Sequence, residues 1–260
     1  MNLPLCSVQR LGIVNYQEAR LLQEKLSGEV AAGARPATLL LLEHPHTYTF
    51  GRRGHIENLL WDEAELEQRG VAVHWTDRGG DVTYHGPGQL VGYPTLPLSI
   101  TTLLTRSAAG APRLPQADYV GYVRRLEQML ILALASFGLD SHQEDGLTGV
   151  WVNKAGDNKL PIPDQASARP PGLAKIAAIG VKVNARGVSL HGFALNLDPD
   201  MSYWQGIVGC GLVGYPVTCV AELLDPAPGM EAVAQAVINS FGKIFQFEMI
   251  ESPNGSASSV

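Results

Sequence analysis

A glycine- and proline-rich stretch, RGGDVTYHGPGQLVGYP at residues 78–94, constrains the fold of this chain more than any other segment. It contains five glycines and two prolines. Glycine permits positive φ and close backbone approach, whereas proline fixes φ and limits the freedom that so many glycines introduce. We therefore predict a rigid loop that adds almost no side chain to a core and brings its backbone close to a ligand. A glycine-rich connection without a ligand is the alternative. The hydrogen-bonding side chains in this loop are Arg78, Asp81, Thr83, Tyr84, His85 and Gln89.

Length and composition indicate a globular chain. With 260 residues and 45% hydrophobic residues, the chain can form one large domain or two small ones around an ordinary core. The longest apolar run, residues 129–135, is far shorter than the ~20 residues of a membrane-spanning helix. The first residues lack the pattern of a secretory signal, so a cytoplasmic location is expected.

Charge and cysteine usage argue against several classes of protein. The net charge is −6, and Lys and Arg are scattered apart from the pairs 52–53 and 124–125. Nucleic-acid binding is therefore not expected, although an acidic partner could dock on a patch formed by these arginine pairs. Three cysteines without a CxxC pair, Cys6, Cys210 and Cys219, favour free thiols over a disulfide framework or a structural zinc site.

A metal centre is not expected either. His44 and His46 have a spacing that could chelate a metal, but no second cluster completes a site, and Pro45 between them suggests a turn.

Periodicity and punctuation predict alternating helices and strands. Apolar residues spaced three and four apart predict helices at 16–30, 118–137 and 230–247, and a further helix is expected at 62–69. Short apolar runs predict strands at 37–43, 71–76, 90–98, 149–152, 175–183 and 187–197. The strand at 90–98 is expected at an edge, because Pro94 and Pro97 cannot donate to a ladder.

The order of these elements predicts an α/β or α+β fold with a mixed, largely antiparallel sheet flanked by helices, since strict βαβ alternation is absent. We expect one domain at 1–251, with a mobile proline-rich insertion at 153–174 and a disordered tail at 252–260. Two lobes divided near residue 150 are the alternative.

Cys210 is the strongest candidate for a nucleophile. It lies between Gly209 and Gly211, so little local bulk covers its side chain. A thiol with a pKa near 8.5 is only a few per cent ionised at neutral pH, so a nucleophilic role needs a positive neighbour or a base. Lys175, His85 and His191 could supply one. For each of these residues a structural role is the competing interpretation.

Taken together, five motifs resemble the octanoyltransferases of lipoate synthesis, also called lipoyl(octanoyl) transferases. They are RGGDVTYHGPGQLVGYP, GVWV, KIAAIGVKV, SLHGFALNL and a GCG that follows about fourteen residues later. The resemblance covers residues 40–225. The stretches 106–117 and 153–174 are longer than the family pattern.

The resemblance implies the fold of the biotin and lipoate protein ligases and the first step of endogenous protein lipoylation. In that step an octanoyl group moves from octanoyl-acyl carrier protein to a lysine of a lipoyl domain, in 2-oxoacid dehydrogenase E2 subunits or the glycine cleavage H protein. It also implies that Cys210 is acylated, that Lys175 tunes its thiol, that no cofactor is needed, and that the protein acts as a monomer. The implied substrate-binding residues are Arg78, Gly79, Gly80, Asp81, Val82, Thr83, Tyr84, His85, Ala178, Ile179, Gly180, Gly192, Phe193 and Ala194.

General chemistry is consistent with these roles. A thioester is already activated, so a thiolate can take over the acyl group without a nucleotide. Two other functions stay open on the sequence alone. One is an ATP-dependent lipoate or biotin protein ligase with the same fold, and the other is a non-catalytic binder of acyl carrier protein or lipoyl domains.

Overall fold

The computed structural model describes residues 3–98, 118–154 and 172–251 and arranges them around two sheets. The larger sheet has eight strands in the order β11-β1-β2-β6-β10-β9-β8-β7. β1 pairs in parallel with β2 and β11, and the other neighbours are antiparallel. The predicted mixed, largely antiparallel sheet is confirmed. Its strands are β1 (Leu5–Ile13), β2 (Ala37–Glu43), β6 (Gln89–Thr95), β7 (His142–Glu144), β8 (Leu147–Asn153), β9 (Leu173–Val183), β10 (Ser189–Asn196) and β11 (Glu248–Glu251).

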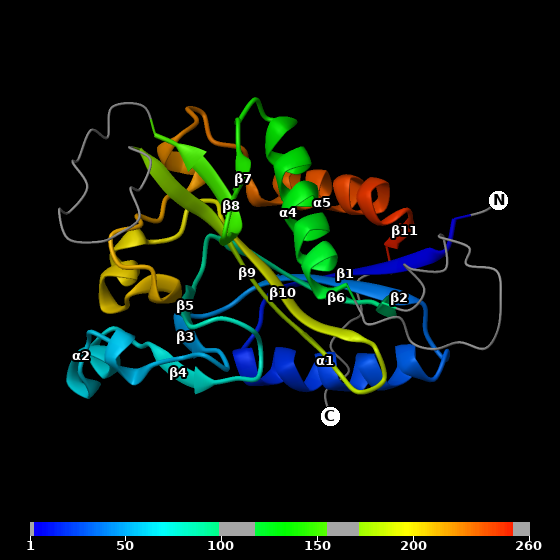
Figure 1. Ribbon diagram of the computed structural model, residues 1–260, viewed down its shortest axis with the longest axis horizontal. Helices are drawn as coiled ribbons and strands as arrows, with labels where there is room; N and C mark the ends of the chain where they lie inside the picture. The colour runs from blue at the N-terminus through cyan, green and yellow to red at the C-terminus, as the bar shows by residue number, and fades with distance from the viewer. Residues whose placement is uncertain (1–2, 99–117, 155–171, 252–260) are drawn as a thin grey trace.

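Helices cover both faces of this sheet (Figure 1). α4 (Tyr119–Ala135) and α5 (Met230–Phe245) pack together on one face, and α1 (Tyr16–Ala31) lies on the other. All three were predicted, and so was the short helix α2 (Glu63–Gln68). Side chains of Asn15, Asp62 and Asp118 accept hydrogen bonds from backbone N–H groups in the first turns of α1, α2 and α4. These caps explain why the helices begin where they do.

β2 shows how the sheet divides the core. Leu39 and Leu41 join the cluster under α4 and α5, whereas Leu40 and Leu42 join the cluster under α1. Successive side chains of a strand point to opposite faces, so a continuous apolar run marks a strand that is covered on both sides. This agrees with the buried strand predicted at 37–43.

A second sheet of three strands was not predicted. Its order is β4-β3-β5, with β3 parallel to β4 and antiparallel to β5. Its strands are β3 (Thr47–Phe50), β4 (Ala72–Trp75) and β5 (Val82–His85). It has its own apolar cluster of Tyr48, Phe50, Val71, Val82, Tyr84 and Ile207. The 3₁₀ turns η1 (Ile56–Asn58), η2 (Met201–Gly206), η3 (Gly209–Gly211) and η4 (Val220–Glu222) complete the described elements.

The expectation that residues 78–94 bury almost no side chain was wrong. The stretch contains β5 and the start of β6, and both Val82 and Tyr84 are completely buried in the small sheet. A strand of four residues between glycines is too short to show a period, and long-range pairing with β3 decides its structure.

The expected edge position of the strand at 90–98 was also wrong, because β6 lies between β2 and β10. Pro94 is tolerated there since it follows the last β6–β10 pair, Gly92 with Phe193. Beyond that pair, the Ser189 hydroxyl donates to the Pro94 carbonyl and accepts from Leu96 N–H. A side chain thus replaces part of the ladder that a proline cannot complete.

Two predictions concern segments outside the described residues. They are the mobility of the insertion at 153–174, of which 155–171 are not described, and the disordered tail at 252–260. The single-domain boundary at residue 251 stays a prediction. No helix in the described ranges is both long and apolar enough to cross a bilayer.

Candidate active site

A cavity of about 620 Å³ brings together segments of both sheets. Fourteen of the sixteen residues named from the sequence as site residues line it. They are Arg78, Gly79, Gly80, Asp81, Thr83, His85, Lys175, Ala178, Ile179, Gly180, Gly192, Phe193, Ala194 and Cys210. Their roles in catalysis and substrate binding stay predictions.

The other two, Val82 and Tyr84, do not line the cavity. They alternate with Thr83 and His85 along β5, so they point into the core of the small sheet. The Tyr84 hydroxyl pairs with Nδ1 of His46 at 2.9 Å. Their side chains do not line this cavity, and a substrate-binding role for the two residues stays a prediction.

Cys210 lies in the tight turn η3 at the cavity wall. Its φ of 57° is left-handed, a conformation that costs a non-glycine residue about 1–3 kcal/mol and that is found mostly at functional sites. Its side chain is partly exposed, whereas Cys6 and Cys219 are buried. Burial raises the pKa of the Cys6 thiol to about 12 and also raises that of Cys219. Of the three thiols, Cys210 is the one placed for reaction with a ligand.

Lys175 reaches the same cavity from β9. Its backbone N–H donates to the Pro216 carbonyl, and its carbonyl accepts from Thr218 N–H, both at 2.9 Å. These two bonds join β9 to the segment that follows Cys210. The side chain is 5% exposed, and its Nζ lies 4.7 Å from the centroid of the Trp151 ring. A cation held over an aromatic face is stabilised there although it is largely withdrawn from water.

The loop between β4 and β5, which also lines the cavity, is hydrogen-bonded to two neighbouring segments. Gly79 N–H donates to the Val181 carbonyl of β9 at 2.9 Å, and the backbone N–H groups of Arg52 and Arg53 donate to the carbonyls of Arg78 and Gly80. Hydrogen bonds to neighbouring segments thus hold this loop, and its rigidity stays a prediction.

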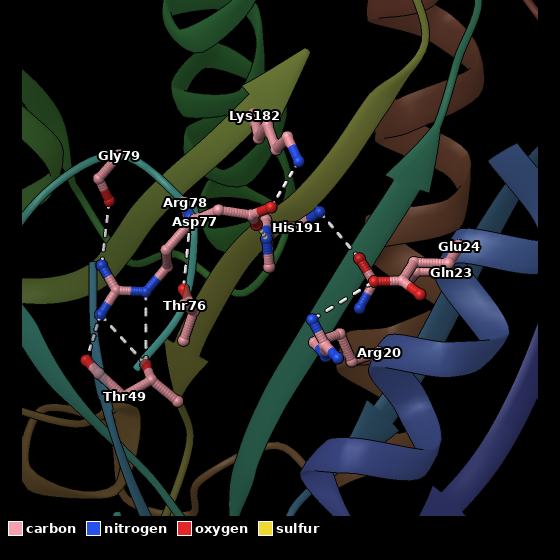
Figure 2. A network of polar contacts seen from close by, with 10 residues as sticks. All are labelled: Arg20, Gln23, Glu24, Thr49, Thr76, Asp77, Arg78, Gly79, Lys182 and His191. Atoms are coloured by element: carbon pink, nitrogen blue, oxygen red, sulfur yellow. Dashed lines mark hydrogen bonds and ion pairs between the residues drawn. The ribbon is translucent and has the colours of Figure 1, made fainter. Parts of the chain in front are cut away.

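Arg78 is a buried cation at the base of this loop (Figure 2). Its guanidinium donates to the carbonyl and hydroxyl of Thr49 and to the Gly79 carbonyl. Burial lowers its pKa below the ordinary value of an arginine, but arginine stays protonated at neutral pH. No carboxylate in the described ranges lies within 4 Å of it as an ion-pair partner, so its charge favours an anionic group in the cavity.

A chain of buried hydrogen bonds starts at Arg78. Its Nη2 donates to the Thr49 hydroxyl at 3.0 Å, and that hydroxyl lies 3.3 Å from Nε2 of His85. Nδ1 of His85 donates to the Gln89 side-chain oxygen at 2.8 Å. Burial holds the pKa of His85 well below its ordinary value, so the imidazole is neutral at pH 7.

The chain continues to the other wall of the cavity. The Gln89 amide donates to the Asn196 side-chain oxygen at 2.8 Å, and the Asn196 amide donates to the Thr218 carbonyl at 3.0 Å. Thr218 N–H in turn donates to the carbonyl of Lys175. Completely satisfied buried networks of this kind fix one arrangement of a core. This one holds Arg78 and Lys175 in place relative to each other.

A second polar network joins His191, Asp77, Lys182 and Gln23 beside Arg78 (Figure 2). His191 also has a left-handed φ, 58°, and its backbone N–H donates to the Gln23 side chain at 2.8 Å. Its Nε2 lies 2.8 Å from Asp77, which also pairs with Lys182. The hydrogen bond from His191 holds the pKa of Asp77 far below its usual range. Burial lowers the pKa of His191 more than Asp77 raises it, so a neutral imidazole donates to a carboxylate.

Tyr16 and Tyr93 line the cavity and were missed by sequence analysis. Tyr93 lies in the middle of β6, two positions from Val91, and packs with it in the cluster under α1. Tyr93 belongs to the glycine- and proline-rich stretch 78–94 but was not among the site residues named there, and Tyr16 belongs to none of the motifs, so the tertiary fold reveals both as cavity residues. Tyr93 O–H donates at 2.7 Å to Nε2 of His44, whose Nδ1–H donates to the Val14 carbonyl. Both His44 nitrogens are therefore occupied.

The buried His44 predicts a dependence of stability on pH. Burial lowers its pKa from 6.5 to about 4. Between these two pKa values the unfolded chain binds a proton that the folded chain does not. The contribution of His44 to the free energy of unfolding is therefore complete above pH 6.5 and is lost as the pH falls. We expect the free energy of unfolding to fall by about 2 kcal/mol from this residue between pH 7 and pH 5. Urea denaturation of wild type and His44→Gln at both pH values measures the difference.

The free energy of unfolding of His44→Gln should change less between pH 7 and pH 5 than that of wild type. If the free energy of unfolding of His44→Gln changes as much as that of wild type between the two pH values, His44 is not the source of the pH dependence.

Comparison with known proteins places this geometry in context. A family model described as the lipoyl protein ligase A/B catalytic domain matches residues 15–242. An octanoyltransferase of Solibacter usitatus is 43% identical over 94% of this chain and 95% of its own. An octanoyltransferase of Chloroflexus aurantiacus is 42% identical over 93% of this chain and 95% of its own.

Solved structures share the fold at low identity. A bi-partite lipoate protein ligase from Thermoplasma acidophilum superposes with a TM-score of 0.63 at 15% identity, over 97% of this chain and 87% of that one. A lipoate-protein ligase A bound with ATP gives 0.61 at 16% identity, over 96% and 90%. At such identities the similarity establishes the fold and not the reaction.

Proposed function

Because this chain belongs to the lipoyl protein ligase A/B catalytic-domain family, we propose that its reaction passes through an octanoyl thioester on Cys210. Its relatives at 42–43% identity over nearly the whole chain are octanoyltransferases, and the chain is an octanoyltransferase that acts in lipoylation. The donor in the proposal is octanoyl-acyl carrier protein, and the acceptor is a lysine of a lipoyl domain. The E2 subunits of 2-oxoacid dehydrogenases and the glycine cleavage H protein carry such domains.

One observation carries this proposal. A partly exposed Cys210 and a buried Lys175 line one cavity, and the backbone bonds of Lys175 to Pro216 and Thr218 join their segments. A thiolate is the reactive form of cysteine, and a neighbouring ammonium stabilises it. The left-handed turn and its flanking glycines leave the sulfur accessible.

In the first step the Cys210 thiolate attacks the carbonyl carbon of the donor thioester. The new C–S bond forms as the bond to the carrier sulfur breaks, and the departing thiolate takes a proton from the Lys175 ammonium. The acyl group stays at the thioester level of activation, so no nucleotide is required. The buried guanidinium of Arg78 supplies positive potential at the cavity, where negative charge develops on the carbonyl oxygen.

In the second step the neutral amine of the acceptor lysine attacks the Cys210 thioester. An amide bond forms, the Cys210 thiolate leaves, and the amine proton passes to Lys175, which the first step left neutral. The cysteine and lysine thereby return to their starting state. Lys175 thus donates a proton in one half-reaction and accepts one in the other, which suits an amine that is largely shielded from water.

Small residues of β9 and β10 provide a place for the acyl chain. Ala178 pairs with Ala194, and Gly180 pairs with Gly192, so small side chains face each other across the two strands at the cavity. Burial of each methylene in such a site is worth about 0.8 kcal/mol. An eight-carbon chain would therefore gain appreciable affinity from this surface.

The test is a transfer reaction with purified full-length chain, octanoyl-acyl carrier protein and a lipoyl domain, in the absence of ATP. We expect octanoylated lipoyl domain, detected by intact mass. Product formed only from free octanoate and ATP, with release of pyrophosphate, would identify a ligase and contradict the proposal. The cytoplasmic location and the monomeric state stay predictions.

A further inference from the structure

A completely buried carboxylate lies behind the cavity, on the face of α4 that packs against β8. Glu127 is 0% exposed and does not line the cavity. One of its oxygens lies 2.8 Å from Nη1 of Arg124, whose side chain is one-third exposed. The other oxygen accepts the backbone N–H of Gly149 at 2.8 Å. Burial of a carboxylate is unfavourable unless its hydrogen bonds are satisfied, so these contacts have a specific structural consequence.

Gly149 lies one residue before an irregular point in the pairing of β8 with β9. The register shifts after Val150, because Val150 pairs with Ala177 whereas the next residue, Trp151, pairs with Lys175, so Ile176 of β9 is the extra residue. An extra residue on one strand is a β-bulge, and bulges next to active sites redirect side chains. Gly149 has a φ of 116°, which a residue with a side chain rarely adopts.

Gly149 itself lies directly against Lys175. A Cβ on Gly149 would lie 2.5 Å from the Ala177 carbonyl oxygen and 3.4 Å from Cε of Lys175. The backbone of Gly149 therefore forms the wall on which the aliphatic stem of Lys175 rests, next to the Trp151 ring. Within the described ranges no carboxylate lies within 4 Å of Nζ of Lys175 as an ion-pair partner, so packing rather than an ion pair directs the amine.

We propose that Glu127 is a positioning residue for octanoyl transfer: its carboxylate fixes the N–H of Gly149 and thereby the backbone wall, facing the bulge of β9, that aims Lys175 at Cys210. The inference rests on the proposed role of Lys175. Glu127 lies outside the cavity, and in this proposal it affects the rate of octanoyl transfer through one backbone N–H group, that of Gly149. Arg124 serves to neutralise the carboxylate from the solvent side.

The test compares Glu127→Leu with Glu127→Gln, each in wild type and in Lys175→Ala. The measured quantity is the single-turnover rate of Cys210 acylation by octanoyl-acyl carrier protein. Glu127→Leu should lower this rate by about 10-fold or more, since small displacements of a catalytic group cost up to about 100-fold. The KM for the donor should not change, because Glu127 does not touch the cavity.

The glutamine oxygen still accepts from Gly149, so Glu127→Gln should retain the rate within about 3-fold. In Lys175→Ala, Glu127→Leu should cause no further loss.

Met129→Ala is the control for a general loss of stability, because it removes a completely buried side chain from the same helix and keeps the Glu127 carboxylate that accepts from Gly149. It should lower the melting temperature and leave the acylation rate unchanged. If Glu127→Leu does not fold, Gly149→Ala tests the same contact with Lys175 from the strand side, with the same expectation in both backgrounds.

The possible failures can be told apart. Equal losses from Glu127→Leu with and without Lys175, or a loss in Glu127→Gln as large as in Glu127→Leu, would overturn the positioning role alone. A Lys175→Ala variant that acylates at the wild-type rate would overturn both the positioning role and the proposed function of Lys175.

Discussion

Cys210→Ala is expected to lower the rate of octanoyl transfer by about 10³-fold or more, because it removes the atom that carries the acyl group. The cavity and the binding loop should persist, since Cys210 is partly exposed in a surface turn and contributes no buried core. The transfer assay with octanoyl-acyl carrier protein and a lipoyl domain measures the loss. Circular dichroism and thermal melting check that the variant is folded.

Cys219→Ala is the matched control, because it removes a thiol from the same region of the chain. That thiol is buried, and its pKa is raised, so it should not react. We expect transfer within about 2-fold of wild type, as for a small change that leaves the reacting groups in place. A Cys210→Ala variant that still transfers octanoyl groups at a substantial rate would exclude a covalent route through this residue.

Lys175→Ala is expected to slow transfer by about 10²- to 10⁴-fold, the usual range for the loss of a general acid or base. Loss of the ammonium also removes a positive charge from the thiol environment. The rate of Cys210 alkylation by iodoacetamide should therefore rise only at higher pH than in wild type. A profile of alkylation rate against pH, beside the transfer assay, measures both effects.

Lys175→Arg separates charge from proton transfer. Its guanidinium keeps the positive charge but does not give up a proton at neutral pH. We expect it to restore much of the alkylation rate and to leave transfer slow. Alkylation profiles that coincide in wild type and Lys175→Ala would refute the influence of Lys175 on the thiol.

Local periodicity predicts the parts of the fold that local interactions decide. The apolar stripes of α1, α4 and α5 follow the 3.6-residue period, and capping side chains mark the starts of α1 and α4. The run of leucines in β2 indicates a strand that is covered on both faces. These elements could be predicted because helices and buried strands have a period that a single sequence displays.

The small sheet could not be predicted in the same way. β3 and β5 are four residues long, and β5 is flanked by glycines, so neither is long enough to show alternation. Their pairing joins residues about 35 positions apart, which no local pattern encodes. The central position of β6 was missed for a related reason, since the Ser189 side chain that compensates Pro94 is distant in the sequence.

The candidate site shows the same division. The sequence motifs identified Cys210, Lys175 and the glycine-rich segments as candidates, because glycine and an isolated cysteine are visible in the sequence itself. Only the fold shows that Thr218 joins Lys175 to the cysteine segment. Glu127 resembles an ordinary helix glutamate in the sequence, and its burial against Gly149 depends on how α4 packs on β8.

The most direct test of the covalent route is peptide mapping by mass spectrometry after brief incubation of the full-length chain with octanoyl-acyl carrier protein alone. We predict one octanoyl group, attached to Cys210, released by hydroxylamine and lost when a lipoyl domain is added. An unmodified Cys210, or an octanoyl group on another residue, in a preparation that transfers octanoyl groups to the lipoyl domain would contradict the mechanism.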